Sequence, residues 1–512
     1  MITLGHMLDQ WSERQPEKEA FIFQDSRVTY GELNKRVNAL GHAFLDFGLP
    51  KGARIAVLTF NCHQFMEIFL ACARVGMLMV PLNFRLVGRE LEYQLNNSES
   101  DILFVGEEFQ ETIQAIEPQL TTVKRYIVIG RPKPETKWLD YDRLIAEHLG
   151  ARPSLPYPVD IQDEFLMIYT SGTTGRPKGA VLTQMNILFT SLNQIIDFKC
   201  TTDDITLTMA PLFHAGGCLI LTFPMIHVGG TAVIMKNFDP EMALKLIAKE
   251  RVTIIFAVPA MWAAIGQVPW IAQADISSLR FSVSGGASQP IEEMKRFNSI
   301  FGLRLTEGYG LSEASSCSTM LMGKFTMQKA GSIGKPFLHN VVKVVNEKGE
   351  EVKPGEVGEI VQKDFTVMKG YYGLPEETSQ TIVDGWLHTG DLATVDEEGF
   401  ITIKGRKKDM IISGAENIYP VEIEQVLMDH PKIQDAAVYG IPDEKWGETV
   451  RAAIVLKQGE TMTAEEVIAY CVKNLAGYKK PRSVIFLDNL PRNPSGKVLK
   501  TELRKVYGQP VS

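Results

Sequence analysis

An alternation of short apolar runs with amphipathic helical patterns extends over most of the 512 residues, and it constrains the fold more than any other feature. Residues 54–58 and 77–82 are typical of strands, and residues 67–76 between them have helical spacing. The same order recurs from 232 to 284, with a helix predicted at 240–250. Because apolar strands joined by helices form mostly parallel sheets covered on both faces, we expect an α/β fold with two such sheets.

The pattern changes after about residue 335. Glycine and proline turn signals then separate short β-rich runs, which predicts a small antiparallel β-subdomain. From residue 409 onward, alternating helical and strand patterns predict a compact α+β unit. We therefore place the domain boundary within residues 405–409, which gives a large domain over 1–407 and a small C-terminal domain over 408–512.

Composition excludes several classes of protein. With 53 basic and 61 acidic residues the net charge is −8, so the chain lacks the general basic surface of a nucleic-acid binder. The six cysteines include no C-x-x-C pair and no zinc-like spacing with histidine, which indicates reduced, mostly buried thiols and a cytoplasmic location. The N-terminus has neither a signal-peptide pattern nor a myristoylation site.

One stretch without acidic or basic residues, 205–235, invites a transmembrane interpretation. Prolines and paired glycines divide it into pieces shorter than the roughly 20 apolar residues that a spanning helix needs. We expect it to form buried core or to line a pocket.

The most informative segment for function is the loop 169–179, Tyr-Thr-Ser-Gly-Thr-Thr-Gly-Arg-Pro-Lys-Gly, which follows the apolar run 165–168. Its backbone N–H groups, hydroxyls and lysine suit a polyphosphate, and its glycines allow close approach to the oxygens. The spacing does not match a Walker loop.

Five further segments follow in a fixed order: 284–287 (SGGA), 308–313 (GYGLSE), 385–391 (GWLHTGD), 405–414 (GRKKDMIISG) and 491–497 (PRNPSGK). Together with the loop they resemble the adenylate-forming (AMP-binding) superfamily of acyl-CoA synthetases, peptide-synthetase adenylation domains and luciferases. Within it the chain is most similar to fatty-acyl-CoA synthetases, in particular the bacterial and mycobacterial long-chain fatty-acid–CoA ligases.

The resemblance implies sites for ATP, Mg²⁺ and CoA. Tyr309 matches the aromatic residue that packs on adenine, Asp391 a ribose ligand, and Arg406 a ribose or phosphate contact. Glu313 and Thr173 match the groups that hold Mg²⁺, an oxygen-seeking cation, and count among the catalytic residues. The residues implied to bind ATP or CoA are Thr170, Ser171, Gly172, Thr173, Thr174, Gly175, Lys178, Gly285, Gly286, Ala287, Glu307, Gly308, Tyr309, Gly310, Ser312, Asp391, Arg406, Lys408, Ser413, Gly414, Trp446 and Lys497.

Lys497 matches the catalytic lysine of the superfamily, which bridges the incoming carboxylate and the α-phosphate. Two anions approach each other in this reaction, so a cation between them orients the pair and stabilises the transition state. A lone lysine near a C-terminus is otherwise usually a solvated residue.

The segment Pro211–Gly217 matches the wall of the carboxylate pocket, where His214 acts as a gate over the phosphate site or as a wall residue. The implied substrate-contacting residues are His214, Ala215, Gly216, Gly286 and Gly310. No fixed charge is available there to pair with an amino group, which disfavours amino-acid substrates.

The CoA site is implied less directly. Ser413 and Gly414 match the segment that lines the pantetheine tunnel, although Ala415 stands where glycine is commoner. Trp446 resembles an aromatic residue that stacks on the CoA adenine; a tryptophan buried in the small domain is the alternative. The basic run 473–505 could meet the CoA 3′-phosphate or form a solvated face.

We therefore predict a ligase that makes an acyl adenylate from a medium- or long-chain fatty acid and ATP, and then an acyl-CoA. The resemblance implies that the small domain rotates about Lys408 between the two steps. The alternatives are an aromatic acid–CoA ligase of the coumarate or benzoate type, acyl transfer to a carrier protein, and a non-catalytic sensor. We expect a monomer or homodimer and leave peripheral membrane contact open.

Overall fold

The computed structural model describes residues 3–170, 176–413, 416–443, 446–492 and 497–509. The predicted residues Ser171–Gly175 and Gly414 lie outside the described part. The chain divides into two compact units: a first unit of residues 1–342 and 362–387, and a second unit of residues 343–361 and 388–512.

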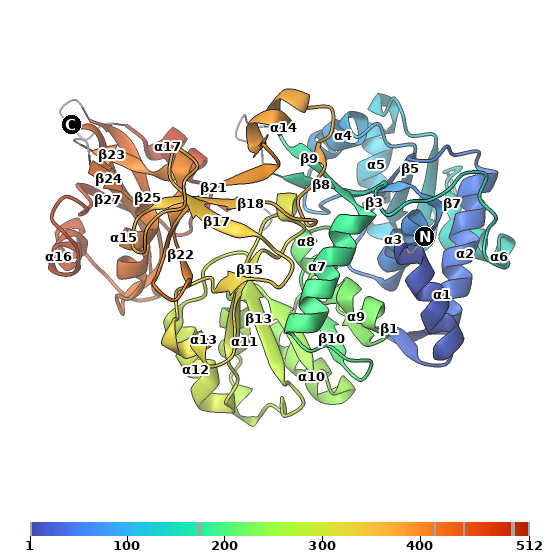
Figure 1. The fold of residues 1–512 in the computed structure, drawn as a ribbon, viewed down its shortest axis with the longest axis horizontal. Coiled ribbons are helices and arrows are strands. Elements are labelled where there is room, and N and C mark those ends of the chain that lie inside the picture. Colours follow the sequence, from blue (N-terminus) through green and yellow to red (C-terminus); the bar gives the residue numbers. More distant parts are fainter. Residues whose placement is uncertain (1–2, 171–175, 414–415, 444–445, 493–496, 510–512) are drawn as a thin grey trace. The chain divides into compact units, whose positions relative to one another are not determined.

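The first unit contains an eight-stranded sheet in which β8 to β7 run parallel and β9 and β19 are antiparallel at one edge (Figure 1). The strands in spatial order are β19 (Gly370–Tyr371), β9 (Lys178–Thr183), β8 (Glu164–Thr170), β4 (Leu78–Pro81), β3 (Arg54–Leu58), β5 (Ile102–Gly106), β6 (Arg125–Ile129) and β7 (Leu139–Asp140).

A nine-stranded sheet in the same unit is parallel in its middle and antiparallel at both edges. Its strands in spatial order are β16 (Lys335–Pro336), β15 (Thr319–Leu321), β14 (Leu305–Tyr309), β13 (Phe281–Gly285), β12 (Ile254–Ala257), β10 (Ile205–Thr208), β11 (Thr231–Ile234), β1 (Glu19–Phe23) and β2 (Ser26–Thr29).

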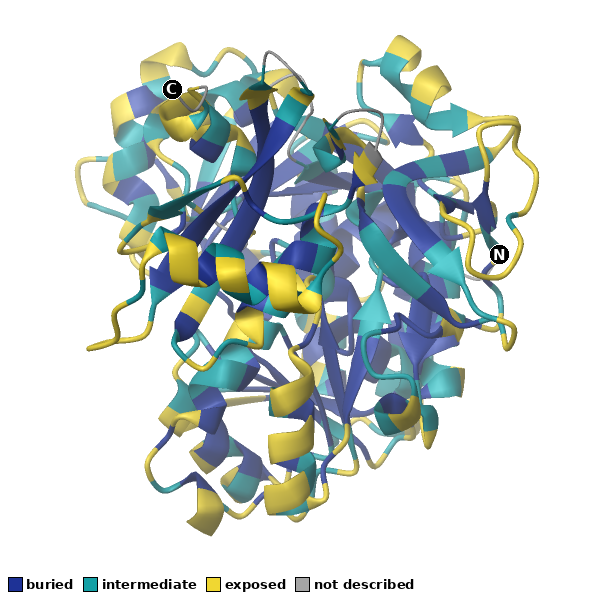
Figure 2. Cartoon of the chain, turned by 90° about the vertical axis from the view of Figure 1, so that its left-hand side faces the viewer, coloured by how far each residue is buried: buried dark blue, intermediate teal, exposed yellow. Residues whose placement is uncertain are grey.

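Fourteen described helices accompany these two sheets. Figure 2 shows helices at the surface that carry exposed residues next to buried ones. They are α1 (Leu4–Arg14), α2 (Tyr30–Asp46), α3 (His63–Val75), α4 (Gly88–Asn97), α5 (Gln110–Ile116), α6 (Tyr141–Glu147), α7 (Gln184–Asp197), α8 (Ala215–Leu219), α9 (Thr222–Val228), α10 (Pro240–Glu250), α11 (Pro259–Gly266), α12 (Ile291–Phe301), α13 (Phe325–Gln328) and α14 (Pro375–Thr381).

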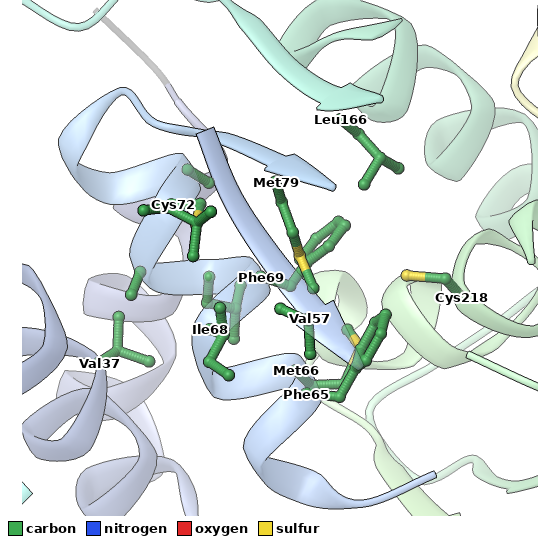
Figure 3. Packing of buried hydrophobic residues seen from close by; sticks show 14 of the residues in the cluster. Val37, Val57, Phe65, Met66, Ile68, Phe69, Cys72, Met79, Leu166 and Cys218 are labelled. Carbon is green, nitrogen blue, oxygen red and sulfur yellow. The ribbon is translucent and has the colours of Figure 1, made fainter. Parts of the chain in front are cut away.

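Both faces of the eight-stranded sheet are buried, as the apolar strands predict. Alternate residues of β3 enter different cores: Ile55 and Val57 join one cluster, Ala56 and Leu58 another. Figure 3 shows the first core, where Val57 lies among side chains of α3. The Phe69 and Phe165 rings meet edge to face with centroids 4.6 Å apart.

Several local predictions are confirmed. Helix α2 follows Thr29, a residue type favoured as a helix cap, and the Thr29 hydroxyl accepts a hydrogen bond from the backbone N–H of Glu32 at 3.2 Å. The helix expected at 240–250 is α10.

The uncharged stretch 205–235 forms β10, α8, α9 and β11 and is almost entirely buried, and all six cysteines are buried. In the part of the chain that the structure describes, no helix is long and apolar enough to cross a membrane.

The second unit is built around a mainly antiparallel sheet with three helices. Its elements are β23 (Ile411–Ser413), β24 (Glu416–Ile418), α15 (Pro420–Met428), β25 (Ile433–Asp443), β26 (Gly447–Leu456), α16 (Ala464–Asn474), β27 (Ser483–Phe486) and α17 (Lys500–Tyr507). The predicted α/β class, with a separate α+β C-terminal part, is confirmed.

The β-subdomain is a five-stranded sheet, and the chain crosses from one unit to the other within it. Its strands are β17 (Val342–Val345), β18 (Gly358–Gln362), β20 (Ile382–Val383), β21 (Trp386–Val395) and β22 (Ile401–Arg406). The compact units therefore do not divide at 407/408. The reason is that β22 pairs with β21 and packs against α15, which ties it to the C-terminal part. A hinge at Lys408 stays a prediction.

Candidate active site

Two of the glycine-rich motifs lie side by side at the carboxyl ends of adjacent parallel strands. Ser284 pairs with Glu307 and Gly285 with Gly308, so the SGGA segment after β13 lies beside the GYG segment after β14. At Gly310 only glycine fits, because a Cβ there would lie 2.0 Å from the carbonyl oxygen of Ser316. This is the edge of an open α/β sheet at which ligands bind.

Glu307 is buried at the start of this motif, with 2% of its surface exposed. The backbone N–H of Gln289 donates to its Oε1 at 3.2 Å, and the Ser284 hydroxyl donates to Gln289 Oε1 at 2.6 Å. Burial raises the pKa of Glu307 to about 7, and the Gln289 N–H only partly opposes this.

Two buried polar atoms in this group, Glu307 Oε2 and Gln289 Nε2, have no hydrogen-bond partner among the described residues. A buried donor and acceptor of this kind suit the hydrogen-bonding edge of a ligand. Gln289 was not expected from the sequence, since an isolated glutamine after a turn carries no signal of this contact.

Strand β8, which leads into the predicted phosphate loop, and the GYGLSE motif, which follows a strand of the other sheet, meet at Glu313. Glu313 lies in a short 3₁₀ helix with the predicted residue Ser312, and Thr170 ends β8 next to the loop. The Thr170 hydroxyl donates to Glu313 Oε1 at 3.1 Å. Lys178 begins β9 on the other side of the loop and is paired with Thr170 in the strand register. Three predicted ATP-site residues are thus brought together.

Tyr371 completes this group and was not predicted; in the sequence it lies between Gly370 and Gly373, which indicated only a turn. Its hydroxyl donates to the same Glu313 oxygen at 3.0 Å, and Lys178 Nζ lies 5.3 Å from the centre of its ring. Hydroxyl and carboxylate oxygens around one phosphate-binding loop form a donor set that suits a hard cation.

His214 precedes α8 as its N-cap residue, and its ring lies 4.5 Å from that of Phe213. Beyond it the chain is closely packed: a Cβ on Gly217 would lie 2.0 Å from the carbonyl oxygen of Pro211. The predicted substrate residues Ala215 and Gly216 begin this helix, and the backbone of Pro211 leaves no room for a side chain at the next residue, Gly217.

Phe256 lies near the end of β12, close to the segment Pro211–Gly217, and it was not predicted from the sequence. A Cβ on Gly216 would lie 3.3 Å from its ring, and one on Gly285 would lie 3.6 Å from it, so the ring contacts both predicted site segments. Phe256 also belongs to a closely packed group of uncharged residues, and the gaps between them are too narrow for a water molecule: Thr206, Leu207, Thr208, Met209, Ala210, Gly217, Ile220, Thr222 and Phe256.

In the second unit, the two predicted ribose and phosphate residues lie together. Asp391 on β21 and Arg406 on β22 are directly paired in the strand register, and Arg406 Nε lies 2.8 Å from Asp391 Oδ1. Asp391 is buried, whereas the Arg406 side chain is 43% exposed. The arginine thus compensates the buried carboxylate, while its side chain as a whole stays partly exposed.

The remaining predicted residues also belong to the second unit. Lys408 and Lys497 are exposed. Ser413 pairs with Gly447, which places the predicted pantetheine segment beside Trp446. Trp446 is partly exposed, and Arg482 lies over its ring at 5.1 Å. Trp446 is thus not completely buried in the small domain, and its stacking on the CoA adenine stays a prediction.

Several cations of the basic run 473–505 are bound to acids of the same unit. Lys479 contacts Glu422 at 2.6 Å, Lys500 contacts Glu424 at 2.8 Å, Arg504 contacts Asp409 at 3.2 Å, and Arg492 pairs with Asp435. Four of these cations are therefore compensated locally, and contact of the basic run with the CoA 3′-phosphate stays a prediction.

Comparison with known proteins places the chain in a family. Residues 8–372 match the family model of the AMP-binding enzymes, and residues 422–497 match that of the AMP-binding enzyme C-terminal domain. The chain belongs to the AMP-binding enzyme family, and the predicted resemblance is confirmed.

Its full-length relatives include three curated proteins. The chain is 39% identical to a feruloyl-CoA synthase of Amycolatopsis sp. (98% of this chain, 99% of the relative) and 36% identical to an indoleacetate–CoA ligase of Aromatoleum aromaticum (99% of both). It is 35% identical to the long-chain-fatty-acid–CoA ligase FadD13 of Mycobacterium tuberculosis over the whole of both chains. The crystal structure of ATP-bound MatB from Rhodopseudomonas palustris matches with a TM-score of 0.90 at 28% identity, covering 99% of each chain. Within the family, the chain groups with the acid–CoA ligases.

Proposed function

We propose that the protein activates an apolar carboxylic acid with ATP and transfers the acyl group to CoA. The observation that carries this proposal is the meeting of Thr170, Lys178 and Glu313 around the phosphate loop, next to the paired SGGA and GYG segments. In the first step a carboxylate oxygen attacks the α-phosphorus of ATP and pyrophosphate leaves. In the second step the CoA sulfur attacks the carbonyl carbon of the acyl adenylate and AMP leaves.

Six of the predicted residues have specific roles in this proposal. Tyr309 packs on adenine, and Asp391 accepts from the ribose hydroxyls. Lys178 and Lys497 supply the positive charge that the first step needs, because both reactants are anions. Trp446 and Ser413 contribute to CoA binding.

Mg²⁺ would enter with ATP. Among the described residues there is no group of three or more His, Cys, Asp or Glu side chains that could hold a metal by themselves. A single carboxylate beside a phosphate loop suits Mg²⁺, which is usually bound by one or two carboxylates together with substrate phosphates. Glu313 is the carboxylate in the described part that fits, and the bound cation would neutralise phosphate charge.

For the substrate we favour a compact aryl acid. The supporting observation is Phe256, whose ring lies close to Gly216 of the predicted carboxylate wall and to Gly285 of the SGGA segment. The uncharged space beyond it is too narrow for a water molecule. An aryl group can end against this ring, whereas a long acyl chain must displace it. The names of the feruloyl and indoleacetate relatives agree with this choice.

A fatty acid, the substrate predicted from the sequence, is the second candidate. It is favoured by the uncharged lining of the same region and by the similarity to FadD13. Transfer to a carrier protein uses the same first step and is an outcome of the test below.

The test is release of AMP and pyrophosphate over a panel of benzoates, cinnamates, arylacetates and fatty acids of graded length, with and without CoA. We expect CoA-dependent AMP release to be greatest with an aryl acid. A maximum with long fatty acids would favour the second candidate, and adenylate formation without CoA consumption would favour a carrier protein as acceptor. No AMP with any acid would refute the proposed function.

A further inference from the structure

The segment 368–372 is fixed to the strand that leaves the phosphate loop. Gly370 and Tyr371 form β19, which pairs antiparallel with Val181 and Ala180 of β9. The backbone N–H of Lys369 donates to Val181 O at 2.9 Å, and that of Tyr372 donates to Gly179 O at 2.8 Å. These backbone bonds determine where the Tyr371 side chain begins.

The same segment is also fixed to the GYGLSE motif, which contains Glu313. The backbone N–H of Met368 donates to the carbonyl oxygen of Glu313 at 2.8 Å, and the Tyr371 N–H donates to the hydroxyl of Thr378 at 2.9 Å. Residues 58 positions apart in the chain, Glu313 and Tyr371, are thereby held in a defined register.

The Tyr371 side chain then contacts two groups of opposite charge. Its hydroxyl donates to Glu313 Oε1 at 3.0 Å, and its ring lies 5.3 Å from Lys178 Nζ. The second donor to Glu313 Oε1 is Thr170 at 3.1 Å. Two hydroxyl donors on one oxygen fix the carboxylate in one orientation, since bonds to a charged acceptor are stronger than neutral ones.

No described residue donates a hydrogen bond to the other oxygen, Glu313 Oε2. The arrangement therefore uses one oxygen for positioning and leaves the second for a cation. The cation–π contact in turn restricts Lys178, a flexible side chain, to the neighbourhood of the loop.

We propose that Tyr371 is a positioning residue for ATP: its hydroxyl orients the Glu313 carboxylate toward the cation of Mg·ATP, and its ring orients Lys178 toward the phosphates. This inference rests on the proposed function. It assigns two separable tasks to one side chain, so the two tasks respond to different substitutions.

The test is direct binding of ATP by calorimetry, in Mg²⁺ and in EDTA, without any acid or CoA. Tyr371→Phe removes the hydroxyl and keeps the ring. We expect it to raise the Kd of Mg·ATP about tenfold or more, the scale of a lost hydrogen bond to a charged group, and to leave the Kd in EDTA within about twofold. Tyr371→Leu, which also removes the ring, should weaken binding in both conditions.

The matched control is Tyr372→Phe. Tyr372 is the next residue in the same segment, and its hydroxyl donates to Glu99 at 3.1 Å rather than to Glu313. We expect its Kd values to equal those of the wild type. In a Glu313→Gln background, Tyr371→Phe should have no further effect on Mg²⁺-dependent binding, because the hydroxyl acts through that carboxylate.

Two results would overturn the inference while leaving the proposed function intact: an unchanged Mg·ATP affinity in Tyr371→Phe, or an equal loss in Mg²⁺ and in EDTA. Absence of ATP binding by the wild-type protein would instead refute the proposed function, and the inference with it. Thermal unfolding of each variant identifies any that fails to fold. In that case the comparison of Tyr371→Phe with the wild type, in Mg²⁺ and in EDTA, decides whether the inference holds.

Discussion

Replacing the buried Glu307 by glutamine should remove a loss of stability that accompanies rising pH between about 5 and 7. Burial raises the pKa of this carboxyl from 4.5 to about 7 in the folded state. Between these two values the folded chain binds more protons than the unfolded chain, so stability falls as pH rises through this window. The charged form that exists above the window is the one that burial disfavours.

The magnitude follows from the size of the shift. Each pKa unit corresponds to about 1.4 kcal/mol, so the total loss of unfolding free energy for the wild-type protein is about 3 kcal/mol, most of it between pH 5 and pH 7. Glutamine keeps the shape and the acceptor for the Gln289 N–H but does not ionise. Glu307→Gln should therefore gain about 2–3 kcal/mol relative to the wild type between pH 5 and pH 8.

Urea unfolding of the ligand-free protein, followed by tryptophan fluorescence from pH 5 to pH 8, measures this difference. Five of the six tryptophans belong to the first unit, which contains Glu307, so the signal reports mainly on that unit. The control is Glu292→Gln, which removes a charge from a side chain that is 78% exposed. Parallel stability curves for the wild type and Glu307→Gln would refute the reasoning, because an ionisation-linked cost must change with pH.

Three further predictions concern the proposed reaction. Lys497→Ala should lower the rate of adenylate formation about a hundredfold or more and largely keep thioester formation from supplied acyl adenylate. Rapid-quench assays of the two half-reactions measure both rates, and an equal loss of both would contradict the assigned role. Trp446→Ala should raise the KM for CoA several-fold without changing pyrophosphate release in the first step; an unchanged KM would exclude stacking on CoA. Phe256→Ala should raise kcat/KM for longer acids, relative to that for the preferred aryl acid, by about tenfold on the acid panel. The control Ile254→Ala, from the same strand and core, should leave this ratio unchanged.

Much of the fold could be predicted because it depends on local sequence. The Thr29 cap and the apolar spacing after it predict α2, and Pro240 at the first position of a helical pattern predicts α10. Hydroxyl caps, proline and 3.6-residue periodicity act within a few residues of where they occur. The motif order predicted the family for a related reason: a phosphate loop needs glycines and hydroxyls at neighbouring positions.

The extent of the compact units depended on contacts that no local pattern encodes. The alternating helical and strand patterns from residue 409 onward suggested a boundary within 405–409. Strand β22 nevertheless belongs with the C-terminal part, because it pairs with β21 and packs against α15. Strand pairing joins distant segments, so a change of composition between two elements does not reveal which partners they choose.

The sequence by itself determined the family and predicted the ATP-site residues, because both follow from residue types at short spacing. Only the tertiary structure decided that Tyr371 contacts Glu313 and Lys178, that Phe256 lies close to Gly216 and Gly285, and that Glu307 titrates near neutral pH. The physical reason is that orientation, enclosed space and burial arise when segments far apart in the chain pack together, and each of them changes the chemistry of a side chain without changing its identity.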